Sequence, residues 1–586
     1  LPYLVRRMLE NGANSSFVNQ IYNKEYKPEE IAVDPVAKAA ANEQKRHPKI
    51  PLPKDIYGAG RQNSSGMDLT DPLTVKKLRQ NIDSHYRHKN YEAAPIISGK
   101  KLSNGVGYQR FNPAISDDVV GRVYDAKFDQ IDNAFAAAKT GHQIWSSTDA
   151  AQRAKTLEHF ANLLEDNRDE LISLCCLEGG RTIKDALDEV REAVDFCRYY
   201  AMRGRRDFVE AGRNLKSPTG ETNRYYLQSR GIFICISPWN FPIAIYTGQI
   251  AAALMAGNAV IAKPAEQTSL IGCFLAELMH RAGIPPEVLT FMPGDGSIGA
   301  ALVQHPDVAG VAFTGSTEVA QSINRTLADK DGAIARLIAE TGGQNAMIVD
   351  SSALTEQVVD DVLHSAFGSA GQRCSACRLL YLQEDIADKT ILMLQGALQE
   401  LTLGDPADLS TDIGPLIDEE AVMLVQQHKT RLGGFGRKIA EVPLDQEMTR
   451  NAHFFAPIIY EIDGLDYLTR EVFGPVLHVI RYEAKDIDKV IDEINNTGYG
   501  LTFGIHSRIQ SFIDKVTSRI RAGNVYVNRG TIGAVVGVQP FGGRGLSGTG
   551  PKAGGPQYLH AFATEKVIST NTTAAGGNAS LVMIKE

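Results

Sequence analysis

Residues 231–264, GIFICISPWNFPIAIYTGQIAAALMAGNAVIAKP, determine the fold class. The run GIFICIS at 231–237 predicts a buried strand, residues 243–256 predict a buried helix, and NAVIAKP at 258–264 predicts a second buried strand. Residues 243–262 form an uncharged run, and a run of about 20 residues is long enough to span a membrane. Glycine and polar residues interrupt the run, however, so a parallel βαβ unit is favoured.

The same alternation continues along the chain. VLTFM (288–292) and GVAFTG (310–315) predict strands, with helices at 268–282, at 297–305 and from 316. A second, similar run begins with NAMIV (345–349) and reaches about residue 545. Upstream, residues 129–205 have helical periodicity, and residues 213–230 predict a hairpin. The sequence therefore predicts an α/β protein with two doubly wound α/β domains.

Composition and charge limit the function classes. The chain has 586 residues, 43% hydrophobic and 22% charged, which is an ordinary globular balance that excludes a disordered or collagen-like chain. A net charge of −8 argues against a nucleic-acid-binding surface. Seven cysteines are too few for a disulfide framework, and the single CxxC at 374–377 lacks the second pair of a zinc site. We expect no metal and a cytoplasmic location.

Glycine patterns by themselves are ambiguous. GxGxxG occurs at 294–299 and at 543–548, and only the first follows a predicted strand and opens a predicted helix. In a chain with 53 glycines, that first pattern is either a dinucleotide site or an ordinary turn.

Three strand ends carry side chains that suit a cofactor or an oxyanion. SPWNFP (237–242) offers the Asn240 amide to a developing oxyanion, although a buried Asn often satisfies loop backbone instead. KPAE (263–266) offers a Lys and a Glu to ribose hydroxyls, or forms an exposed ion pair. FTGS (313–316) places a serine at a helix start, where it can help to bind phosphate or simply cap the helix.

A candidate nucleophile and a candidate base follow. ETGGQN (340–345) sets Glu340 beside two glycines that allow it to move. GQRC (371–374) sets Arg373 beside Cys374, where the arginine would favour the thiolate; an inert buried cysteine is the alternative. EVFGP (471–475) offers a glutamate for a ribose and a phenylalanine for a flat ring, and PFGG (540–543) follows a loop at 530–537.

In this order and spacing, the seven motifs resemble the aldehyde dehydrogenase superfamily over roughly residues 95–570. RCSAC (373–377) and the 530–537 loop resemble the L-glutamate γ-semialdehyde (Δ1-pyrroline-5-carboxylate) dehydrogenases. The resemblance implies an aldehyde dehydrogenase-like fold in which the 213–230 hairpin and ATEKVIS (563–569) form a β-hairpin oligomerisation flap. It therefore implies a homo-oligomer, at least a dimer.

The resemblance also implies the roles of individual residues. Cys374 would be the nucleophile, Asn240 and the Cys374 N–H would stabilise the oxyanion, and Glu340 would activate water. The cofactor would be NAD, bound by Ile236, Trp239, Lys263, Glu266, Gly296, Phe313, Ser316, Val319, Gly342, Glu471 and Phe473. The substrate would contact Phe241, Arg373, Ser375, Gly533, Ala534 and Phe541. Glu266 favours NAD over NADP, because a carboxylate repels a 2′-phosphate, and the pyrophosphate would lie nearer Ser316 than residues 294–299.

The first residues resemble a different enzyme. Tyr3, Arg6, Arg7 and Glu10 resemble the last helix of the flavin-dependent proline dehydrogenase barrel, whose paired arginines bind the proline carboxylate. TTAAGGNAS (572–580) resembles the end of the bacterial bifunctional proline utilization A proteins, which join both enzymes. The chain starts at Leu1 inside a predicted helix, so we expect a piece of a longer protein whose barrel is missing. We expect no flavin and no proline oxidation here, and at most peripheral membrane association through the parent protein.

The expected organisation is a barrel remnant (1–22), a linker (23–90), an NAD-binding domain (91–343), a catalytic domain (344–546) and a return segment with the flap strand (547–586). Three alternatives stay open. The chain could be another semialdehyde dehydrogenase of the superfamily. It could be a catalytically silent scaffold, which the intact Cys374, Glu340 and Asn240 argue against. It could be a DNA-binding regulator, which the charge and the absence of a basic recognition helix argue against.

Overall fold

The computed structural model describes residues 2–12, 16–44, 46–47, 49–87, 90–218, 220–445, 448 and 450–575. The chain forms two compact units, Leu1–Gly58 and Ala59–Glu586. The smaller unit contains α1 (Pro2–Gly12), α2 (Phe17–Tyr22), α3 (Pro28–Ile31) and α4 (Pro35–Ala41). Within α1, Arg6 and Arg7 each contact Glu10 at 2.9 Å. The two arginines that the resemblance assigns to a proline carboxylate therefore pair with an acid of their own helix.

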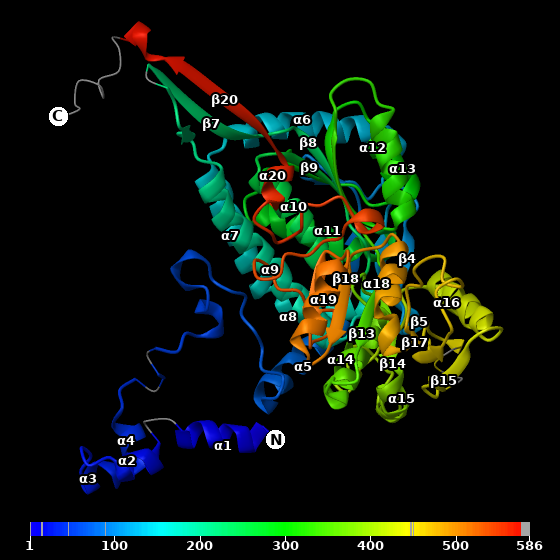
Figure 1. Ribbon diagram of the computed structural model, residues 1–586. Coiled ribbons are helices and arrows are strands. Elements are labelled where there is room, and N and C mark those ends of the chain that lie inside the picture. The colour runs from blue at the N-terminus through cyan, green and yellow to red at the C-terminus, as the bar shows by residue number, and fades with distance from the viewer. Residues whose placement is uncertain are drawn as a thin grey trace. The chain divides into compact units, whose positions relative to one another are not determined.

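The larger unit contains a seven-stranded sheet in the order β12-β11-β8-β9-β10-β2-β3; β8 and β9 are labelled in Figure 1. Its parallel strands are β8 (Ile232–Ile236), β9 (Ala259–Lys263), β10 (Leu289–Phe291), β11 (Val308–Gly315) and β12 (Arg336–Thr341). The antiparallel edge is β2 (Ile96–Ile97) and β3 (Lys100–Lys101). The connecting helices are α10 (Ala244–Met255), α11 (Ser269–Arg281), α12 (Gly296–Gln304) and α13 (Thr317–Ala328).

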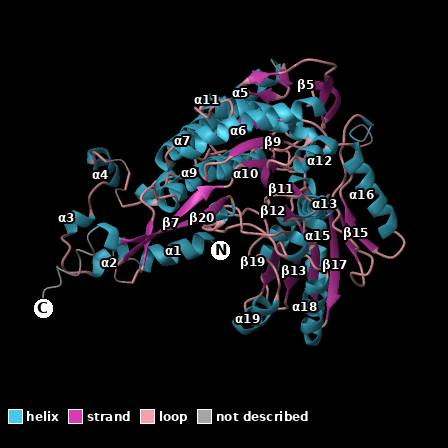
Figure 2. Ribbon diagram, turned by 90° about the horizontal axis from the view of Figure 1, so that it is seen from above, coloured by secondary structure: helices cyan, strands magenta, loops and turns pink. Residues whose placement is uncertain are grey.

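This sheet confirms the predicted alternation. The uncharged run at 243–262 forms α10 and then β9, and among the described helices none is both long and apolar enough to cross a bilayer. Successive residues of β8 enter different apolar clusters. Ile232 and Ile234 pack with α6 (Ile131–Ser147), whereas Phe233 and Cys235 pack with α10. Helices therefore cover both faces of the sheet (Figure 2).

A second seven-stranded sheet has the order β15-β16-β17-β14-β13-β18-β19. Its strands are β13 (Asn345–Val349), β14 (Cys377–Gln383), β15 (Arg437–Glu441), β16 (Ile458–Glu461), β17 (Val476–Tyr482), β18 (Thr502–His506) and β19 (Asn524–Val527). All neighbours are parallel except β15 and β16. Its helices include α14 (Thr355–Phe367), α15 (Glu384–Leu398), α16 (Glu419–Leu432), α18 (Ile487–Asn496) and α19 (Gln510–Arg519). The two doubly wound α/β sheets of the prediction are confirmed.

The helical layer of the larger unit starts earlier than the sequence suggests. It comprises α5 (Pro72–Arg87), α7 (Ala150–Asp166), α8 (Arg168–Gly179) and the 25-residue α9 (Ile183–Asp207), together with α6. Leu78 and Ile82 of α5 are buried in the core, so residues 72–87 of the expected linker form a packed helix. The five domain limits themselves stay predictions.

Two small sheets complete the unit. One has the order β1-β5-β4, with β1 (Tyr91–Ala93), β4 (Tyr108–Asn112) and β5 (Ile115–Val123). The other contains the predicted hairpin, β6 (Arg213–Leu215) and β7 (Glu221–Ser229), joined by β20 (Ala563–Asn571) in the order β20-β7-β6. β7 and β20 pair in antiparallel register from Ala563↔Ser229 to Asn571↔Glu221, and they lie side by side in Figure 1. We call this sheet the flap.

The strand order of the first sheet creates the place for a site. From β8 the chain adds β9 and β10 on one side, and it then returns to place β11 and β12 on the other side. In open α/β sheets, such a reversal leaves a crevice beyond the carboxyl ends of the two strands where the order changes. The motif at 237–242 follows β8, and the motif at 313–316 lies at the end of β11. The two motifs therefore meet at this crevice.

Candidate active site

Two cavities meet at Cys374. The larger, about 610 Å³, lies beyond the ends of β8 and β11. The smaller, about 320 Å³, adjoins it. Ile245, Thr314, Thr341 and Cys374 line both cavities. A thiol at this position can react with a molecule in one cavity while a second molecule occupies the other.

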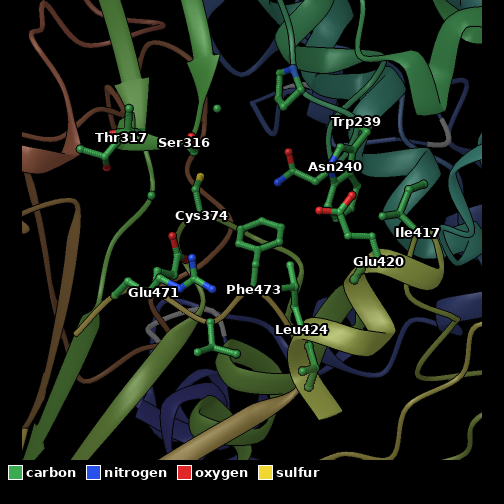
Figure 3. Close-up of a pocket in the computed structure, with 18 of the residues that line it drawn as sticks. Trp239, Asn240, Ser316, Thr317, Cys374, Ile417, Glu420, Leu424, Glu471 and Phe473 are labelled. Atoms are coloured by element: carbon green, nitrogen blue, oxygen red, sulfur yellow. The ribbon is translucent and has the colours of Figure 1, made fainter. Parts of the chain in front are cut away.

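Besides Cys374, the larger cavity contains five of the predicted cofactor residues and one further predicted catalytic residue. These are Trp239, Ser316, Gly342, Glu471 and Phe473, with Asn240. The Phe473 ring packs edge-on against Trp239, with ring centroids 5.6 Å apart. Figure 3 shows the Asn240 amide pointing to the side of the cavity where Cys374 lies. The cavity therefore has aromatic, hydroxyl and carboxylate groups close to the thiol.

Six predicted cofactor residues line neither cavity: Ile236, Lys263, Glu266, Gly296, Phe313 and Val319. Lys263 is buried at the end of β9, and its Nζ donates to the Pro264 carbonyl at 3.1 Å. Phe313 is buried in β11, whereas Val319 is 47% exposed in α13. The proposed cofactor roles of these residues stay predictions.

One wall of the larger cavity was missed by the sequence analysis. It is formed by α16 and the turn before it, and its residues are Ile417, Asp418, Glu420, Ala421, Leu424, Val425, Gln427, His428 and Arg431. Ile417, Glu420 and Leu424 are seen in Figure 3 opposite the Cys374 side. The sequence of α16 is that of an ordinary amphipathic helix, so no local signal could have assigned it to the site.

The larger cavity fits a dinucleotide. Ser316 caps α13 and accepts a hydrogen bond from the Val319 N–H at 3.2 Å, so the backbone N–H groups of the first turn lie at the cavity wall where an anion is favoured. A Cβ at Gly342 would lie 1.7 Å from Oε2 of Glu471, so a larger residue at this position would displace the Glu471 carboxylate. Glu471 accepts hydrogen bonds from the Gly343 N–H at 3.2 Å and from Arg378 at 3.1 Å.

The smaller cavity contains all six predicted substrate residues: Phe241, Arg373, Ser375, Gly533, Ala534 and Phe541. Glu340 also lines it. Its α9 side, which carries three acidic residues and Arg191, was missed. Asp188, Glu192 and Asp195 line the cavity from α9, and their spacing on one helical face is a signal that the sequence did contain. Burial, with the nearby charges of Glu189 and Asp188, raises the pKa of Glu192 to about 8.

Arg373 lowers the pKa of Cys374, in the direction that the sequence predicts, but its effect is outweighed. Burial, followed by the charges of Glu471 and Glu340, raises the pKa of Cys374 to about 12, although Arg373 acts in the opposite direction. The Arg373 guanidinium is already engaged, because it donates to Asp185 at 2.6 Å and to the Ser369 hydroxyl at 2.8 Å. The thiol is therefore neutral at physiological pH and needs a base.

Glu340 is suited to be that base. It lies next to last in β12, and burial raises its pKa to about 7, although the Ala553 N–H donates to it. Its Oε1 is buried and has no hydrogen-bond partner among the described residues. A carboxylate that titrates near pH 7 with an unsatisfied oxygen can accept a proton from a group in the cavity.

Asn240 is suited to donate. It is buried, and its Nδ2 donates to the Gln372 carbonyl at 3.1 Å, which fixes the amide beside the nucleophile. An amide nitrogen carries two N–H groups, so one N–H is left for a ligand oxygen. The structure thus places Asn240 in the larger cavity, Glu340 in the smaller cavity and Cys374 in both, and their catalytic roles stay predictions.

Comparison with known proteins agrees with this site. The model of the aldehyde dehydrogenase family matches residues 101–568. The chain is 49% identical to the bifunctional protein PutA of Klebsiella aerogenes, over 96% of this chain and 42% of that protein. It is 36% identical to a 1-pyrroline-5-carboxylate dehydrogenase of a Geobacillus species, over 86% of this chain and 98% of that protein. The chain thus spans less than half the length of the PutA relative.

Solved structures agree as well. A variant of Bradyrhizobium japonicum proline utilization A superposes with a TM-score of 0.86 at 49% identity, covering 98% of this chain and 55% of that chain. A variant of Thermus thermophilus 1-pyrroline-5-carboxylate dehydrogenase superposes with a TM-score of 0.83 at 31% identity, covering 87% and 99%. The family model matches most of the chain, and the structure has two doubly wound sheets and a thiol between two cavities. The chain therefore belongs to the aldehyde dehydrogenase family.

Proposed function

We propose that the chain oxidises L-glutamate γ-semialdehyde, the open form of Δ1-pyrroline-5-carboxylate, to L-glutamate, with NAD as the hydride acceptor. The observation that carries the proposal is the position of Cys374 between a cavity with predicted cofactor residues and a cavity with all the predicted substrate residues. The Geobacillus relative, which aligns over nearly its whole length, is named for this substrate.

Membership of the family implies dependence on NAD(P). The choice of NAD rests on Glu266, because a carboxylate accepts hydrogen bonds from ribose hydroxyls and repels a 2′-phosphate. Glu471 and Phe473 suit the nicotinamide half, and the start of α13 at Ser316 suits the pyrophosphate. When bound, the nicotinamide ring supplies the hydride acceptor.

Glu340 and Cys374 would begin the reaction. Ionised Glu340 takes the thiol proton, and the sulfur then attacks the aldehyde carbon, so that a C–S bond forms and the carbonyl π electrons move onto oxygen. The Asn240 amide and the Cys374 N–H donate to that oxygen. Loss of hydride from the same carbon leaves a thioester on Cys374. Glu340, after releasing its proton to solvent, takes a proton from water, whose oxygen attacks the thioester as the C–S bond breaks.

The smaller cavity suits both charged groups of the substrate. The Ser375 hydroxyl and the N–H groups of Gly533 and Ala534 would bind the α-carboxylate, where the φ of +79° at Gly533 makes a side chain unfavourable. On the α9 side of the same cavity, the carboxyl groups of Asp188 and Asp195 suit the α-ammonium. Phe241 and Phe541 would pack on the methylene groups.

The experiment is NADH formation with Δ1-pyrroline-5-carboxylate, beside propanal, succinic semialdehyde and a Cys374→Ala control. We expect a signal that needs the thiol and strongly prefers the five-carbon amino acid. Equal rates with simple aldehydes would support the proposed thiol chemistry but contradict the proposed substrate. A folded protein that binds NAD but oxidises no aldehyde would contradict the function.

We also infer that the chain is part of a longer protein and self-associates. Residues 1–22 would belong to a proline dehydrogenase barrel, which is consistent with the match to PutA over 96% of this chain but 42% of that protein. A homo-oligomer, at least a dimer, would form through the flap, whose β20 has a free edge within the described residues.

A further inference from the structure

The backbone around Cys374 is held in an unusual way. The carbonyl oxygens of all six residues 371–376, here called the nucleophile segment, accept hydrogen bonds from side chains. The donors are Asn240, Asn345, Arg378, Thr502 and Thr531. The carbonyl side of the segment is therefore fixed to the protein.

One of these contacts sets the direction of the proposed oxyanion donor. Arg378 Nη2 donates to the Arg373 carbonyl at 3.2 Å. In a planar trans peptide the C=O of one residue and the N–H of the next point in opposite directions. Holding the Arg373 carbonyl toward Arg378 therefore turns the Cys374 N–H away from Arg378, and that N–H has no hydrogen-bond partner among the described residues.

The same arginine also holds the loop that carries the predicted nicotinamide-binding residues, here called the cofactor loop (471–474). Arg378 donates to the Glu471 carboxylate at 3.1 Å and to the Gly474 carbonyl at 3.0 Å, and it lies over the Phe473 ring at 5.3 Å. Its Nη1 also donates to the Gly371 carbonyl at 2.7 Å. Arg378 is 3% exposed, so this buried cation depends on the hydrogen bonds and the ring that these two segments offer.

The two segments also touch directly. Gly371 has a φ of +67°, and a Cβ there would lie 2.3 Å from the Gly474 carbonyl oxygen. A shift of the cofactor loop must therefore move the nucleophile segment or strain it, and Arg378 is the side chain that hydrogen-bonds to both.

We propose that Arg378 is a positioning residue that links the cofactor loop to the peptide carrying the Cys374 N–H, so that the oxyanion donor is aligned when Glu471 binds the cofactor. The proposal rests on the proposed function, because it assumes that Glu471 contacts the cofactor. A planar guanidinium with a fixed fork of donors can bridge two segments, whereas a lysine ammonium cannot reproduce that geometry.

The first test is Arg378→Lys, with Arg481→Lys as the matched control. Arg481 lies in β17 of the same sheet and pairs with Glu384, Asp388 and Glu461 instead. We expect Arg378→Lys to lower kcat about 10- to 100-fold, as a misaligned oxyanion donor does, with KM changed less than about threefold. Alkylation of Cys374 by iodoacetamide, which develops no oxyanion, should change less than about threefold, and Arg481→Lys should alter neither rate.

Two results would overturn the role. One is a kcat within twofold of wild type in folded Arg378→Lys. The other is an equal loss of kcat and of alkylation rate, because a merely damaged site would lose both. A double-mutant cycle with Glu471→Gln tests the link itself: coupled residues give a combined loss well below the product of the two single losses, and a full product would refute the link.

A second arm does not need Arg378→Lys to fold, or the substrate to be correct. We expect saturating NAD to change the alkylation rate of Cys374 in the wild type, and that response to fall at least threefold in Glu471→Gln. An unchanged response in that variant would overturn the link. Absence of aldehyde oxidation by the wild type would instead contradict the proposed function, while this arm still tests the link between Glu471 and Cys374.

Discussion

At the scale of single residues, burial sets the chemistry of the site. Cys374 and Glu340 both have raised pKa values because the cavity removes water from them, and the charge of Glu340 adds to the effect on the thiol. The result is a neutral thiol beside a carboxylate that titrates near neutrality. Such a pair can move one proton between its members without a strong permanent charge.

The pH dependence of activity should follow Glu340. Its pKa is raised to about 7, so the carboxylate is protonated below that pH and cannot act as a base. We expect kcat to fall about tenfold per pH unit below 7 and to level off above it. Glu340→Gln should lower kcat by about 10²- to 10⁴-fold and remove this limb, measured from pH 5.5 to 9. If kcat of the Glu340→Gln variant still falls below pH 7, a group other than Glu340 is responsible for the pH dependence.

Substrate choice should depend on Ser375. Its side chain lines the smaller cavity, while its carbonyl is held by Thr502 and Thr531, so the residue is positioned through its backbone. Ser375→Ala should raise KM for the semialdehyde about tenfold, by loss of a hydrogen bond to a charged group. KM for propanal should stay within about twofold, since propanal has no carboxylate; equal losses for both would exclude this role.

At the scale of elements, α9 holds the turn that leads to the nucleophile. Ser369 and Ala370, with φ of +60° and +54°, adopt the left-handed conformation that L-residues avoid. Asp185 of α9 accepts hydrogen bonds from the Ser369 hydroxyl at 2.8 Å and from Arg373 at 2.6 Å. A helix far away in sequence thus stabilises a strained turn four residues before Cys374.

Asp185→Asn should therefore lower stability in a pH-dependent way. Burial opposes ionisation of Asp185, but the charges of Arg373 and Arg181 lower its pKa to about 2. Because the folded pKa is below the unfolded value, its stabilising effect is present above about pH 4 and is lost as the pH falls toward 2.

We expect urea unfolding at pH 7 to show Asp185→Asn less stable by about 3 kcal/mol, the cost of breaking a buried ion pair. The difference in unfolding free energy between Asp185→Asn and the wild type should become smaller as the pH falls from 4 to 2. Asp488→Asn, which removes an exposed acid paired with Lys515 and Arg519, should cost less than about 1 kcal/mol. A gap that does not change with pH would show that the charge of Asp185 is not what stabilises the turn.

At the scale of the whole molecule, the flap joins distant parts of the chain and presents an edge. β20 pairs with β7 across more than 300 positions of sequence, and within the described residues its other edge has no strand partner. Val567 and Ile568 on β20 are 54% and 41% exposed. An exposed edge strand with apolar side chains is a template for association.

We expect light scattering at micromolar concentration to give at least the dimer mass. Replacing Val567 and Ile568 together by Lys should shift the mass toward the monomer, because it places charge on the associating edge. Ile334→Lys, at a residue that is 94% exposed and belongs to none of the flap strands, should leave the mass unchanged. A wild-type protein at the monomer mass across this range would contradict association through the flap.

Much of the fold could be predicted from local sequence. The strands and helices between 231 and 328 lie within about two residues of their predicted limits, because uncharged β-rich runs and short connections specify parallel βαβ units without help from elsewhere. The motifs at strand ends, with Asn240, Glu340 and Cys374, were identifiable for the same reason. The packing of α5 could not be predicted from the sequence, because Leu78 and Ile82 become core residues only when other helices cover them.

The sequence by itself therefore determined the sheet-and-helix plan and the residue types at each strand end, since both are written in short stretches of chain. Only the tertiary structure decided what those residues do together. It placed α16 across the cavity from Cys374, kept the thiol neutral by burial, and engaged Arg373 with Asp185 rather than with the nucleophile. It also set Arg378 between two segments about 100 positions apart. These outcomes depend on which distant groups exclude water from one another, and short-range patterns do not encode that.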